Sequence, residues 1–583
     1  MLLARLWRHL SLRRRHQFYL LLVLTVLSSF AEIISLSSVL PFVGAITEPE
    51  KVFGSPLVTT LTHWIGIPHG TNLVIPLAIG FVVASLVAGG LRLLLVWVSV
   101  RLGNSAGADL SIEVFRRTLY QSYSVHVARS SSEVISGMTQ KVGIATGVLS
   151  AVMSLTTSGL MFAAIMVTLI VIDPIVATIS VVLFGSAYVV IAWLTRKRVA
   201  RNGQRSAREQ NQMIKVIQEG LGGIRDVLMD GTQSAYCDAY RKSITPRQRA
   251  ESENIFMATA PRYVMEAFGM VLIAFLVLAM TLQSGRAVTV LPILGVLALG
   301  AQRSLPLMQQ LYSGWSTMLA SRAALLDVLA LLDQPLPAQA DEPEPVPLTL
   351  REAIRFDNVS FQYNENSPWV LVDFNLLIAK GERVGIIGST GCGKSTALDL
   401  LMCLLEPTRG QILVDGQPVS QDHQRAWQRT VAHVPQSIFL ADTTIAENIA
   451  FGIPHGQIDF DRVRNAARQA RIAEFIDSRP EAYSAIVGER GVRLSGGQRQ
   501  RIGIARALYK QAEVIIFDEA TSALDNETEQ SVMQAIEGLS QDLTLLIIAH
   551  RLTTLKNCTQ IVELGGGGIK RVGSYQDIVK QGA

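Results

Sequence analysis

Six long apolar segments between residues 18 and 311 constrain the fold of this 583-residue chain more than any other feature. A helix of about 20 apolar residues is long enough to cross the hydrocarbon core of a bilayer. Basic residues gather at the edges of the segments, as in residues 5–15 and 196–201, which is typical of cytoplasmic flanks. We therefore expect a multi-pass membrane domain with both chain termini in the cytoplasm. The segments are Phe18–Ile46, Leu73–Val100, Val148–Ile172, Ile175–Leu194, Met257–Leu282 and Val288–Leu311.

Two polar excursions interrupt the apolar segments on the cytoplasmic side. Residues 101–143 and 195–255 are polar but compatible with helix, and both are too long for a tight turn. Each excursion needs a turn, and the candidates for these coupling tips lie near residues 121–126 and 218–225. On the external side, apolar residues recur at helical spacing at about residues 52–66, where we expect an amphipathic helix rather than an ordered loop.

A proline-rich segment, residues 334–350, predicts an extended linker between two domains. Residues 1–333 before it form the predicted membrane domain. In residues 351–583, predicted strands alternate with predicted helices, which favours an α/β domain. The expected fold is therefore an all-α transmembrane domain of six helices fused to an α/β domain.

A glycine-rich loop in the α/β domain predicts a nucleotide site. Residues 388–395, Gly-Ser-Thr-Gly-Cys-Gly-Lys-Ser, follow an apolar strand and fit the phosphate-loop pattern G-x-x-x-x-G-K-[ST]. The glycines let the backbone N–H groups converge on a polyphosphate, and the next helix points its positive end at the anion. Lys394 would reach the β- and γ-phosphates and Ser395 would bind Mg²⁺, so we expect ATP and Mg²⁺ as cofactors. The predicted nucleotide-binding residues of this loop are Gly388, Ser389, Thr390, Gly391, Cys392, Gly393, Lys394, Ser395 and Thr396.

Polar side chains after three other apolar strands predict the catalytic groups. One strand ends in Asp518 and Glu519, so that Asp518 can hold Mg²⁺ and Glu519 can polarise the attacking water. The amide of Gln436 can also reach Mg²⁺, and His550 can contact the γ-phosphate. We therefore predict Glu519, His550 and Gln436 as catalytic residues and Ser395, Gln436 and Asp518 as metal ligands.

Two further motifs flank these groups. Tyr363 precedes the phosphate loop and could stack on adenine. Residues 494–498, Leu-Ser-Gly-Gly-Gln, combine a hydroxyl, two glycines and a helix N-terminus, which together favour an anion. No anion in the same chain is assigned to this second site. Its predicted binding residues are Ser495, Gly496, Gly497 and Gln498.

In this order the motifs resemble the nucleotide-binding domain of the ABC transporter family. Residues 388–395 match its Walker A motif and residues 494–498 match its LSGGQ signature without a substitution. Six spans before one such domain resemble an exporter-fold half-transporter. The resemblance implies a homodimer in which the signature of one copy closes over ATP held by the other. The residues that match the Q-loop, Walker B motif, D-loop and switch histidine are Gln436, Asp518 with Glu519, the nucleotide-binding Asp525, and His550.

Charged residues within the apolar segments bear on the cargo. Arg92, Arg262 and Arg303 lie inside or at the edges of these segments, as do Glu32 and Glu266. One interpretation is internal pairing of arginine with glutamate that fixes packing. The other is a cationic cavity for an anionic headgroup, because arginine binds anionic groups by paired, charge-assisted hydrogen bonds.

The sequence around Arg262 and Arg303 is similar to the lipid-linked oligosaccharide flippases of bacterial N-glycosylation. That family has a further arginine where this chain has Gln310. The resemblance implies an ATP-driven flippase in the bacterial inner membrane whose substrate, a lipid-linked glycan or related anionic glycolipid, contacts Arg92, Arg262 and Arg303.

Other functions remain open at this stage. A multidrug, lipid A or peptide exporter would share the fold, and an uncharged aromatic cavity would favour drugs. A soluble ABC ATPase acting on DNA or ribosomes would lack the six spans. An ATP-gated channel or regulator usually lacks a catalytic glutamate, whereas Glu519 is present. Nucleic acid is not an expected partner, because the basic residues cluster at membrane edges without a recognition motif.

Overall fold

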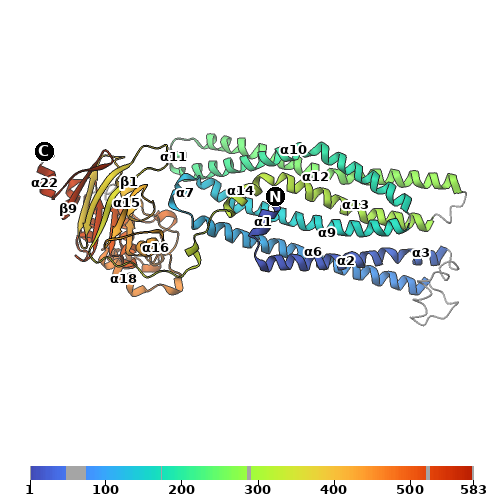
Figure 1. Ribbon diagram of the computed structural model, residues 1–583, viewed down its shortest axis with the longest axis horizontal. Coiled ribbons are helices and arrows are strands. Elements are labelled where there is room, and N and C mark those ends of the chain that lie inside the picture. The colour runs from blue at the N-terminus through green and yellow to red at the C-terminus, as the bar shows by residue number, and fades with distance from the viewer. Residues whose placement is uncertain are drawn as a thin grey trace. The chain divides into compact units, whose positions relative to one another are not determined.

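The chain forms two compact units (Figure 1). One unit comprises Met1–Gln121 and His126–Pro337, and the other comprises Ser122–Val125 and Ala338–Ala583. The division after Pro337 falls inside the predicted linker. The computed structural model describes residues 2–47, 74–172, 174–284, 291–519, 526–549 and 551–580. The predicted external helix at about residues 52–66 lies outside these ranges.

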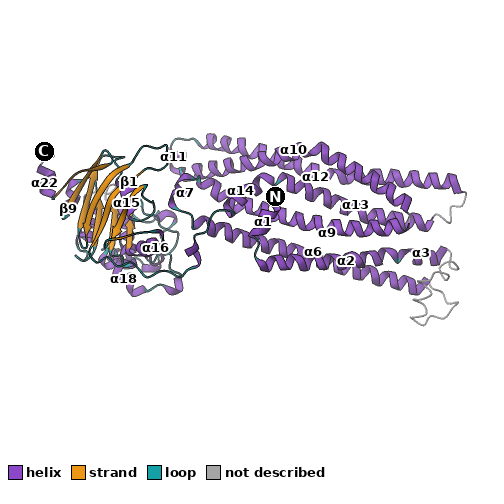
Figure 2. Cartoon of the chain, viewed as in Figure 1, coloured by secondary structure: helices purple, strands orange, loops and turns teal. Residues whose placement is uncertain are grey.

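The first unit is helical throughout its described residues (Figure 2). Its longest helices continue the apolar segments into the polar excursions, and α12 reaches 52 residues. The chain turns between α6 and α7 and again between α10 and α11, where the two coupling tips were predicted. The elements are α1 (Leu2–His9), α2 (Leu12–Ser37), α3 (Val39–Thr47), α6 (Val74–Leu119), α7 (Tyr123–Ala128), α8 (Ser131–Ser136), the π-helix η1 (Gly137–Lys141), α9 (Val142–Ile172), α10 (Pro174–Gly222), α11 (Ile224–Met229), α12 (Gln233–Ser284), α13 (Leu291–Ala320) and α14 (Arg322–Leu332).

Apolar surface on these helices fits a bilayer. Within the described residues, Leu12–Ser37, Val74–Leu119 and Ser131–Val171 are long and apolar enough to span a membrane. The bent pair Gln302–Ala320 and Arg322–Leu332 qualifies as a fourth span when it is taken together. Large apolar side chains such as Leu93 and Trp193 are 74% and 75% exposed. A water-soluble protein rarely exposes so much contiguous apolar surface, whereas lipid accommodates it.

Small residues bring the membrane helices close together. Helix α10 runs alongside α12, α9 packs on α13, and α2 packs on α6 (Figure 1). A Cβ atom added to Gly107 would lie 2.2 Å from the Thr146 hydroxyl, and one added to Gly203 would lie 2.0 Å from the carbonyl oxygen of Ala320. Only glycine allows such a close approach, which is a common device in membrane helix packing.

The basic N-terminal segment forms a helix that packs on the membrane unit. Residues 2–9 form helix α1, and its Leu6 side chain is almost fully buried. Arg5 and His9 both bond the carboxylate of Asp333, just beyond α14. The hydrogen bonds with Arg5 and then His9 lower the pKa of Asp333. Because the partners are more than 300 positions apart in the chain, spacing alone gave no sign of this contact.

The second unit contains two sheets and a helical region. An antiparallel sheet has the order β2-β1-β4-β5, and a mainly parallel sheet has the order β10-β9-β3-β8-β7-β6. The strands are β1 (Ala353–Phe361), β2 (Leu371–Ala379), β3 (Arg383–Gly388), β4 (Arg409–Val414), β5 (Gln417–Pro418), β6 (Val431–Val434), β7 (Val514–Asp518), β8 (Thr544–Ile548), β9 (Gln560–Gly565) and β10 (Gly568–Gly573). The helices are α15 (Lys394–Leu401), α16 (Gln421–Thr430), α17 (Ile445–Ile449), α18 (Phe460–Gln469), α19 (Ala473–Asp477), α20 (Gly496–Lys510), α21 (Asn526–Glu537) and α22 (Tyr575–Lys580).

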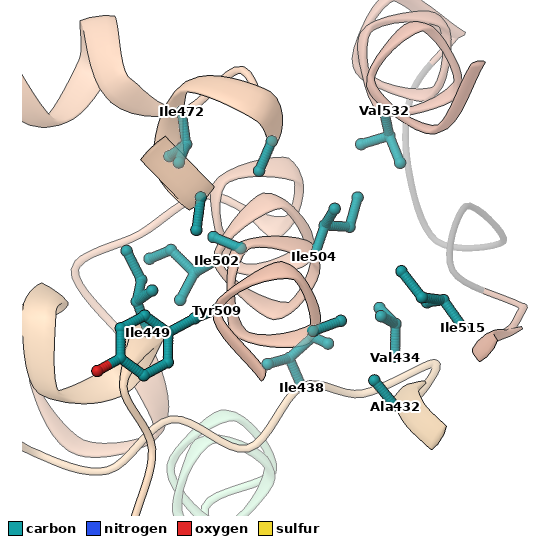
Figure 3. Packing of buried hydrophobic residues seen from close by; sticks show 14 of the residues in the cluster. Ala432, Val434, Ile438, Ile449, Ile472, Ile502, Ile504, Tyr509, Ile515 and Val532 are labelled. Atoms are coloured by element: carbon teal, nitrogen blue, oxygen red, sulfur yellow. The ribbon is translucent and has the colours of Figure 1, made fainter. Parts of the chain in front are cut away.

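The parallel strands are buried on both faces and separate two hydrophobic cores. Successive residues of a strand point to opposite faces, so Ile515 joins one core and Ile516 the other. In the first core, α20 packs on the end of β6, where a Cβ atom added to Gly503 would lie 3.5 Å from a Val434 methyl group. Ile502 and Ile504 of α20 belong to the same core (Figure 3). This packing fixes α20 against the strands that carry the predicted site. The combination of a helical transmembrane region and an α/β nucleotide-binding domain confirms the expected fold class.

Candidate nucleotide-binding site

Neighbouring parallel strands bring the main motifs to one edge of the sheet. Ile386 of β3 pairs with Ile548 of β8, which in turn pairs with Asp518 of β7. The phosphate loop begins two residues after Ile386, and the loop with Gln436 begins just after β6, which pairs with β7. Ligands in α/β sheets bind at the carboxyl ends of strands, where such loops converge. The topology therefore places the separate sequence motifs at one location.

Glycines shape the phosphate loop. Gly393 has φ of 100°, in the left-handed region, and its added Cβ would lie 2.8 Å from a Leu371 methyl group. An added Cβ on Gly388 would lie 2.6 Å from both the Cys392 sulfur and the Leu564 carbonyl oxygen. A side chain at either position would force the loop apart, so the glycine pattern reflects both backbone angle and space.

The charge of Lys394 lies inside the loop. Its Nζ atom donates hydrogen bonds to the carbonyl oxygens of Gly388 at 2.8 Å and Ser389 at 3.2 Å. The side chain is almost fully buried, and its backbone opens helix α15. A cation and a helix N-terminus thus converge on one point, which suits a phosphate group.

Tyr363 and Thr396 form one side of the site. Their hydroxyl oxygens are 3.2 Å apart, and the ring of Tyr363 also packs edge-on against Phe361 at 5.1 Å. The Tyr363 side chain nevertheless remains largely exposed, so a flat ring is presented next to the phosphate loop. This geometry suits stacking on a base.

Three side chains suit Mg²⁺. Ser395 is exposed at the start of α15, Gln436 is exposed after β6, and Asp518 ends β7. Burial raises the pKa of Asp518, Glu519 raises it further, and Lys394 opposes the rise. No group of three or more His, Cys, Asp and Glu side chains in the described residues could hold a metal. A hydroxyl, an amide and one carboxylate still fit Mg²⁺, which takes most of its remaining oxygens from phosphate and water.

Glu519 occupies a strained backbone position beside Asp518. Its φ is 48°, in the left-handed region that few residues other than glycine adopt. Its N–H donates to the carbonyl oxygen of Ile548 at 3.1 Å, which holds the turn to the neighbouring strand β8. Strain of this kind clusters at functional sites because it fixes the direction of a side chain. The predicted residues His550 and Asp525 lie outside the described residues.

The signature motif forms a well-capped helix N-terminus. The hydroxyl of Ser495 accepts from the N–H of Gln498 at 3.3 Å, and the side chain of Gln498 accepts from the N–H of Ser495 at 2.9 Å. This reciprocal capping box fixes the first turn of α20. The N–H groups of Gly496 and Gly497 belong to the same turn, where a helix has no internal acceptors for them. The motif can therefore present N–H groups to an anion.

The sequence reasoning missed Gln500, a buried residue behind the signature motif. Its side-chain amide donates to the carbonyl oxygen of Gln436 at 2.8 Å. This contact joins the helix of the signature to the loop of a predicted metal ligand. The only sequence signal was a polar residue on the otherwise apolar buried face of α20.

In the membrane unit, two of the three predicted substrate arginines are paired. Arg303 of α13 bonds Glu32 of α2 at 2.5 Å, and Glu32 is buried. Arg262 bonds Glu266 one turn away at 2.8 Å, and both side chains are about half exposed. Arg92 lies partly buried on α6. The contacts of Arg303 and Arg262 agree with the interpretation that pairing of arginine with glutamate fixes helix packing. A role of the three arginines in cargo binding stays a prediction.

The fold and the site define an ATP-binding cassette joined to a transmembrane helical unit. The family model described as ABC transporter matches residues 371–522, and the model described as ABC transporter transmembrane region matches residues 18–302. The chain belongs to the ABC transporter family, whose ATPase domains couple hydrolysis to transport.

Curated relatives agree with this assignment. The chain is 32% identical over 402 residues to an ATP-dependent lipid A-core flippase of Alkalilimnicola ehrlichii, which covers 68% of this chain and 67% of that protein. It is 40% identical over 264 residues to the flippase of the same description from Methylococcus capsulatus, covering 45% and 43%. It is also 41% identical over 238 residues to the mouse ATP-binding cassette sub-family B member 5, covering 40% and 19%. The aligned region thus spans about two thirds, or less, of each relative.

A solved structure shares the fold. The structure of a bacterial Atm1-family ABC exporter with ATP bound matches with a TM-score of 0.77 and 24% identity, covering 98% of this chain and 96% of that chain. The exporter fold, which was expected from apolar spans followed by one nucleotide-binding domain, is therefore confirmed. The relatives also favour lipid A export, one of the alternatives left open by the sequence, over the lipid-linked oligosaccharide interpretation.

Proposed function

We propose that this protein is an ATP-driven flippase that moves an anionic glycolipid of the lipid A-core type across the bacterial inner membrane. The observation that carries the proposal is the alignment of 402 residues with a lipid A-core flippase, which is longer than the whole nucleotide-binding unit. The similarity therefore includes membrane helices, which contact the cargo. The proposed topology has six spans, with both termini and both coupling tips in the cytoplasm.

Each residue of the nucleotide site has a different role in ATP hydrolysis. Lys394 holds the β- and γ-phosphates, and Tyr363 stacks on the base. Ser395, Gln436 and Asp518 would hold Mg²⁺, which when bound neutralises charge on the β- and γ-phosphate oxygens. Glu519 accepts a proton from the attacking water, because its carboxylate follows Asp518 on a turn held to β8. His550 and Asp525 are proposed to act in the same site.

Two copies would complete each nucleotide site. The capping box of Ser495 and Gln498 leaves the N–H groups of Gly496 and Gly497 for an anion. In the proposed homodimer, that anion is the phosphate of ATP held by the phosphate loop of the second copy. Closure of the two nucleotide-binding units then drives the membrane helices, and hydrolysis reverses the closure.

Charged side chains within the membrane unit are the candidates for binding the cargo. Charged side chains are costly at membrane depth and mark substrate pathways or internal pairs. Arg303 and Glu32 satisfy each other, whereas Arg262 and Glu266 remain about half exposed and could exchange partners with a phosphorylated headgroup. A lipid-linked oligosaccharide is the second candidate, favoured by the sequence around Arg262 and Arg303 and disfavoured by Gln310. That residue accepts a hydrogen bond from Ser158 at 2.6 Å.

Reconstitution tests the proposal. Purified protein in proteoliposomes is supplied with lipid A-core glycolipid, a polyprenyl-pyrophosphate glycan, an uncharged drug or a peptide. We expect lipid A-core glycolipid to stimulate ATP hydrolysis and to move between leaflets only with ATP. The Glu519→Gln variant is the inactive control. Stimulation by drug or peptide with none by either glycolipid would reject the proposed cargo class.

A further inference from the structure

A cavity of the membrane unit is lined by both apolar and polar side chains, none of which belongs to the nucleotide site or to the paired arginines. It has a volume of about 250 Å³ and is lined by residues of η1, α9, α10, α12, α13 and α14. Its charged and amide side chains are Lys141 of η1, Gln210 of α10, and Arg247, Glu251 and Asn254 of α12. Most of its lining lies beyond the cytoplasmic ends of the predicted spans, so the cavity faces the cytoplasmic side in the proposed topology.

Three buried polar atoms of the lining have no hydrogen-bond partner among the residues that the structure describes. They are Nε2 of Gln210, Nε of Arg247 and Oδ1 of Asn254. Gln210 is only 4% exposed, so bulk water has little access to its side-chain amide. Buried polar groups in folded proteins are nearly always hydrogen-bonded, so three unpartnered atoms in one lining leave room for the polar groups of a ligand to pair with them.

A buried cation lines the same cavity. Lys141 is 3% exposed, and its Nζ atom bonds the Asp327 carboxylate at 2.5 Å. Asp327 is about half exposed and is not part of the lining. An ammonium has three N–H donors, and this contact uses one. Lys141 is also the last residue of the π-helix, an irregularity that is frequent at functional sites.

The cavity is not a result of loose packing. At Gly203, which lines it, α10 approaches the carbonyl oxygen of Ala320 so closely that an added Cβ would lie 2.0 Å away. At Gly137, the first residue of η1, an added Cβ would lie 2.6 Å from a Leu331 methyl group. The helices are therefore in firm contact beside the cavity, and the cavity persists between them.

We propose that this cavity binds a small phosphate-bearing molecule that also carries hydroxyl groups. Lys141, Gln210 and Arg247 supply donors to phosphate oxygens, since charge-assisted bonds of this type are strong. Arg247 keeps further N–H groups for this purpose, because its ion pair with Glu251, at 3.5 Å, involves only Nη2. Glu251 and Asn254 supply acceptors for hydroxyl groups of the same ligand. The ligand is either the headgroup of a lipid of the cytoplasmic leaflet or a soluble phosphate ester. The inference does not depend on the identity of the transported cargo.

The test measures binding to full-length protein in phosphatidylcholine nanodiscs. The soluble probe is glycerol 1-phosphate, with glycerol as its control, and the lipid probe is phosphatidylglycerol added to the nanodisc. We expect saturable binding of at least one phosphate-bearing probe and none of glycerol. Binding of phosphatidylglycerol alone assigns the site to a lipid, and binding of glycerol 1-phosphate assigns it to a soluble ester.

Gln210→Leu is the decisive variant. It removes the unpartnered amide at similar volume, so we expect affinity for the bound probe to fall about tenfold while the unfolding temperature stays equal or rises. The matched control is Gln212→Leu, at an exposed position of the same helix, which should bind like the wild type. Binding at the phosphate loop would not respond to Gln210→Leu. The proposal is overturned if neither phosphate-bearing probe binds, or if Gln210→Leu leaves the affinity unchanged.

Discussion

The side-chain amide of Gln500 donates a hydrogen bond to the backbone carbonyl of Gln436, with 2.8 Å between nitrogen and oxygen. Gln500 is buried on α20, whose first turn is the signature motif, and Gln436 is a proposed Mg²⁺ ligand. The two motifs would serve different nucleotide sites in the proposed dimer. In that proposed dimer, this hydrogen bond would link one nucleotide site directly to the other.

Gln500→Leu should lower ATP turnover without unfolding the protein. The variant removes a hydrogen bond worth about 0.5–1.5 kcal/mol, which corresponds to a loss of several-fold in rate if the bond aligns Gln436 during hydrolysis. ATPase assays in proteoliposomes measure the effect. Gln469→Leu, at the exposed end of α18, is the matched control. A Gln500→Leu variant that hydrolyses ATP as fast as this control would show that the bond is only structural.

Glu519→Gln should abolish turnover while preserving ATP binding. The amide keeps the size of the side chain but cannot accept the proton of the attacking water, and general bases contribute about 10²–10⁴-fold. We expect at least a hundredfold fall in ATPase rate together with retention of ATP and a stable closed dimer. Equilibrium binding measures the retention of ATP, and size-exclusion chromatography measures the closed dimer. Turnover close to that of the wild type would assign the base to another residue.

Local motifs explain why much of this site could be predicted from the sequence. The phosphate loop, its lysine and the strand ending in Asp518 each lie within a few consecutive residues, so their geometry follows from local chain direction. Strand order then brought them together at one sheet edge, as parallel α/β topology requires. The residues of the signature motif predicted an anion site, and the family resemblance added its proposed partner, the ATP held by another copy.

Contacts between distant residues explain what the sequence left out. The bonds of Arg5 and His9 with Asp333, the pairing of Arg303 with Glu32, and the cavity around Gln210 all join helices far apart in the chain. A charged residue in an apolar segment indicates that it has a partner, but the sequence does not show which residue that partner is. For Arg303 the sequence left pairing and substrate binding open, and the packed helices supply a glutamate.

Variants of the ion pair between Arg303 and Glu32 can distinguish a role in helix packing from a role in cargo binding. Glu32→Leu should lower the unfolding temperature by several degrees, because it leaves an uncompensated charge in a partly buried site. The double variant Glu32→Leu with Arg303→Met should recover most of that loss, since neither charge remains. Scanning fluorimetry in detergent measures stability, and the reconstituted assay measures transport. If the double variant regains both stability and flipping, Arg303 has no role at the cargo.

Asp415 should make folding sensitive to acid. Burial alone would raise its pKa, but hydrogen bonds from the backbone N–H groups of Glu352, Arg351 and Ala353 outweigh burial and lower the pKa. The folded carboxyl thus binds its proton more weakly than the unfolded one. Its stabilisation is fully present above the ordinary pKa and is lost as pH falls through the lower, folded pKa.

Asp415→Asn should therefore destabilise the protein at pH 7 and matter progressively less in acid. We expect a loss of about 1–2 kcal/mol at neutral pH, because the amide cannot accept all three N–H groups. Unfolding temperatures of wild type and variant, measured from pH 7 to the acid limit of folding, should converge as pH falls. Asp461→Asn, a change at an exposed carboxylate of α18, is the control. A difference that stays constant with pH contradicts the assigned cause.

Cys392 should make ATP hydrolysis sensitive to thiol reagents. Its sulfur lies inside the phosphate loop, next to Gly388, and the residue is buried. A maleimide attached there would fill the space that the phosphates need, so alkylation should inactivate the enzyme and ATP should protect it.

Burial raises the pKa of Cys403 and of Cys558 to about 12, which keeps both as unreactive thiols at neutral pH. The exposed Cys237 will react as well, but it lies in the membrane unit. Cys392→Ala should therefore confer resistance while Cys237→Ala should not, with mass spectrometry reporting which thiol is modified. Inactivation that persists in Cys392→Ala would place the sensitive thiol outside the phosphate loop.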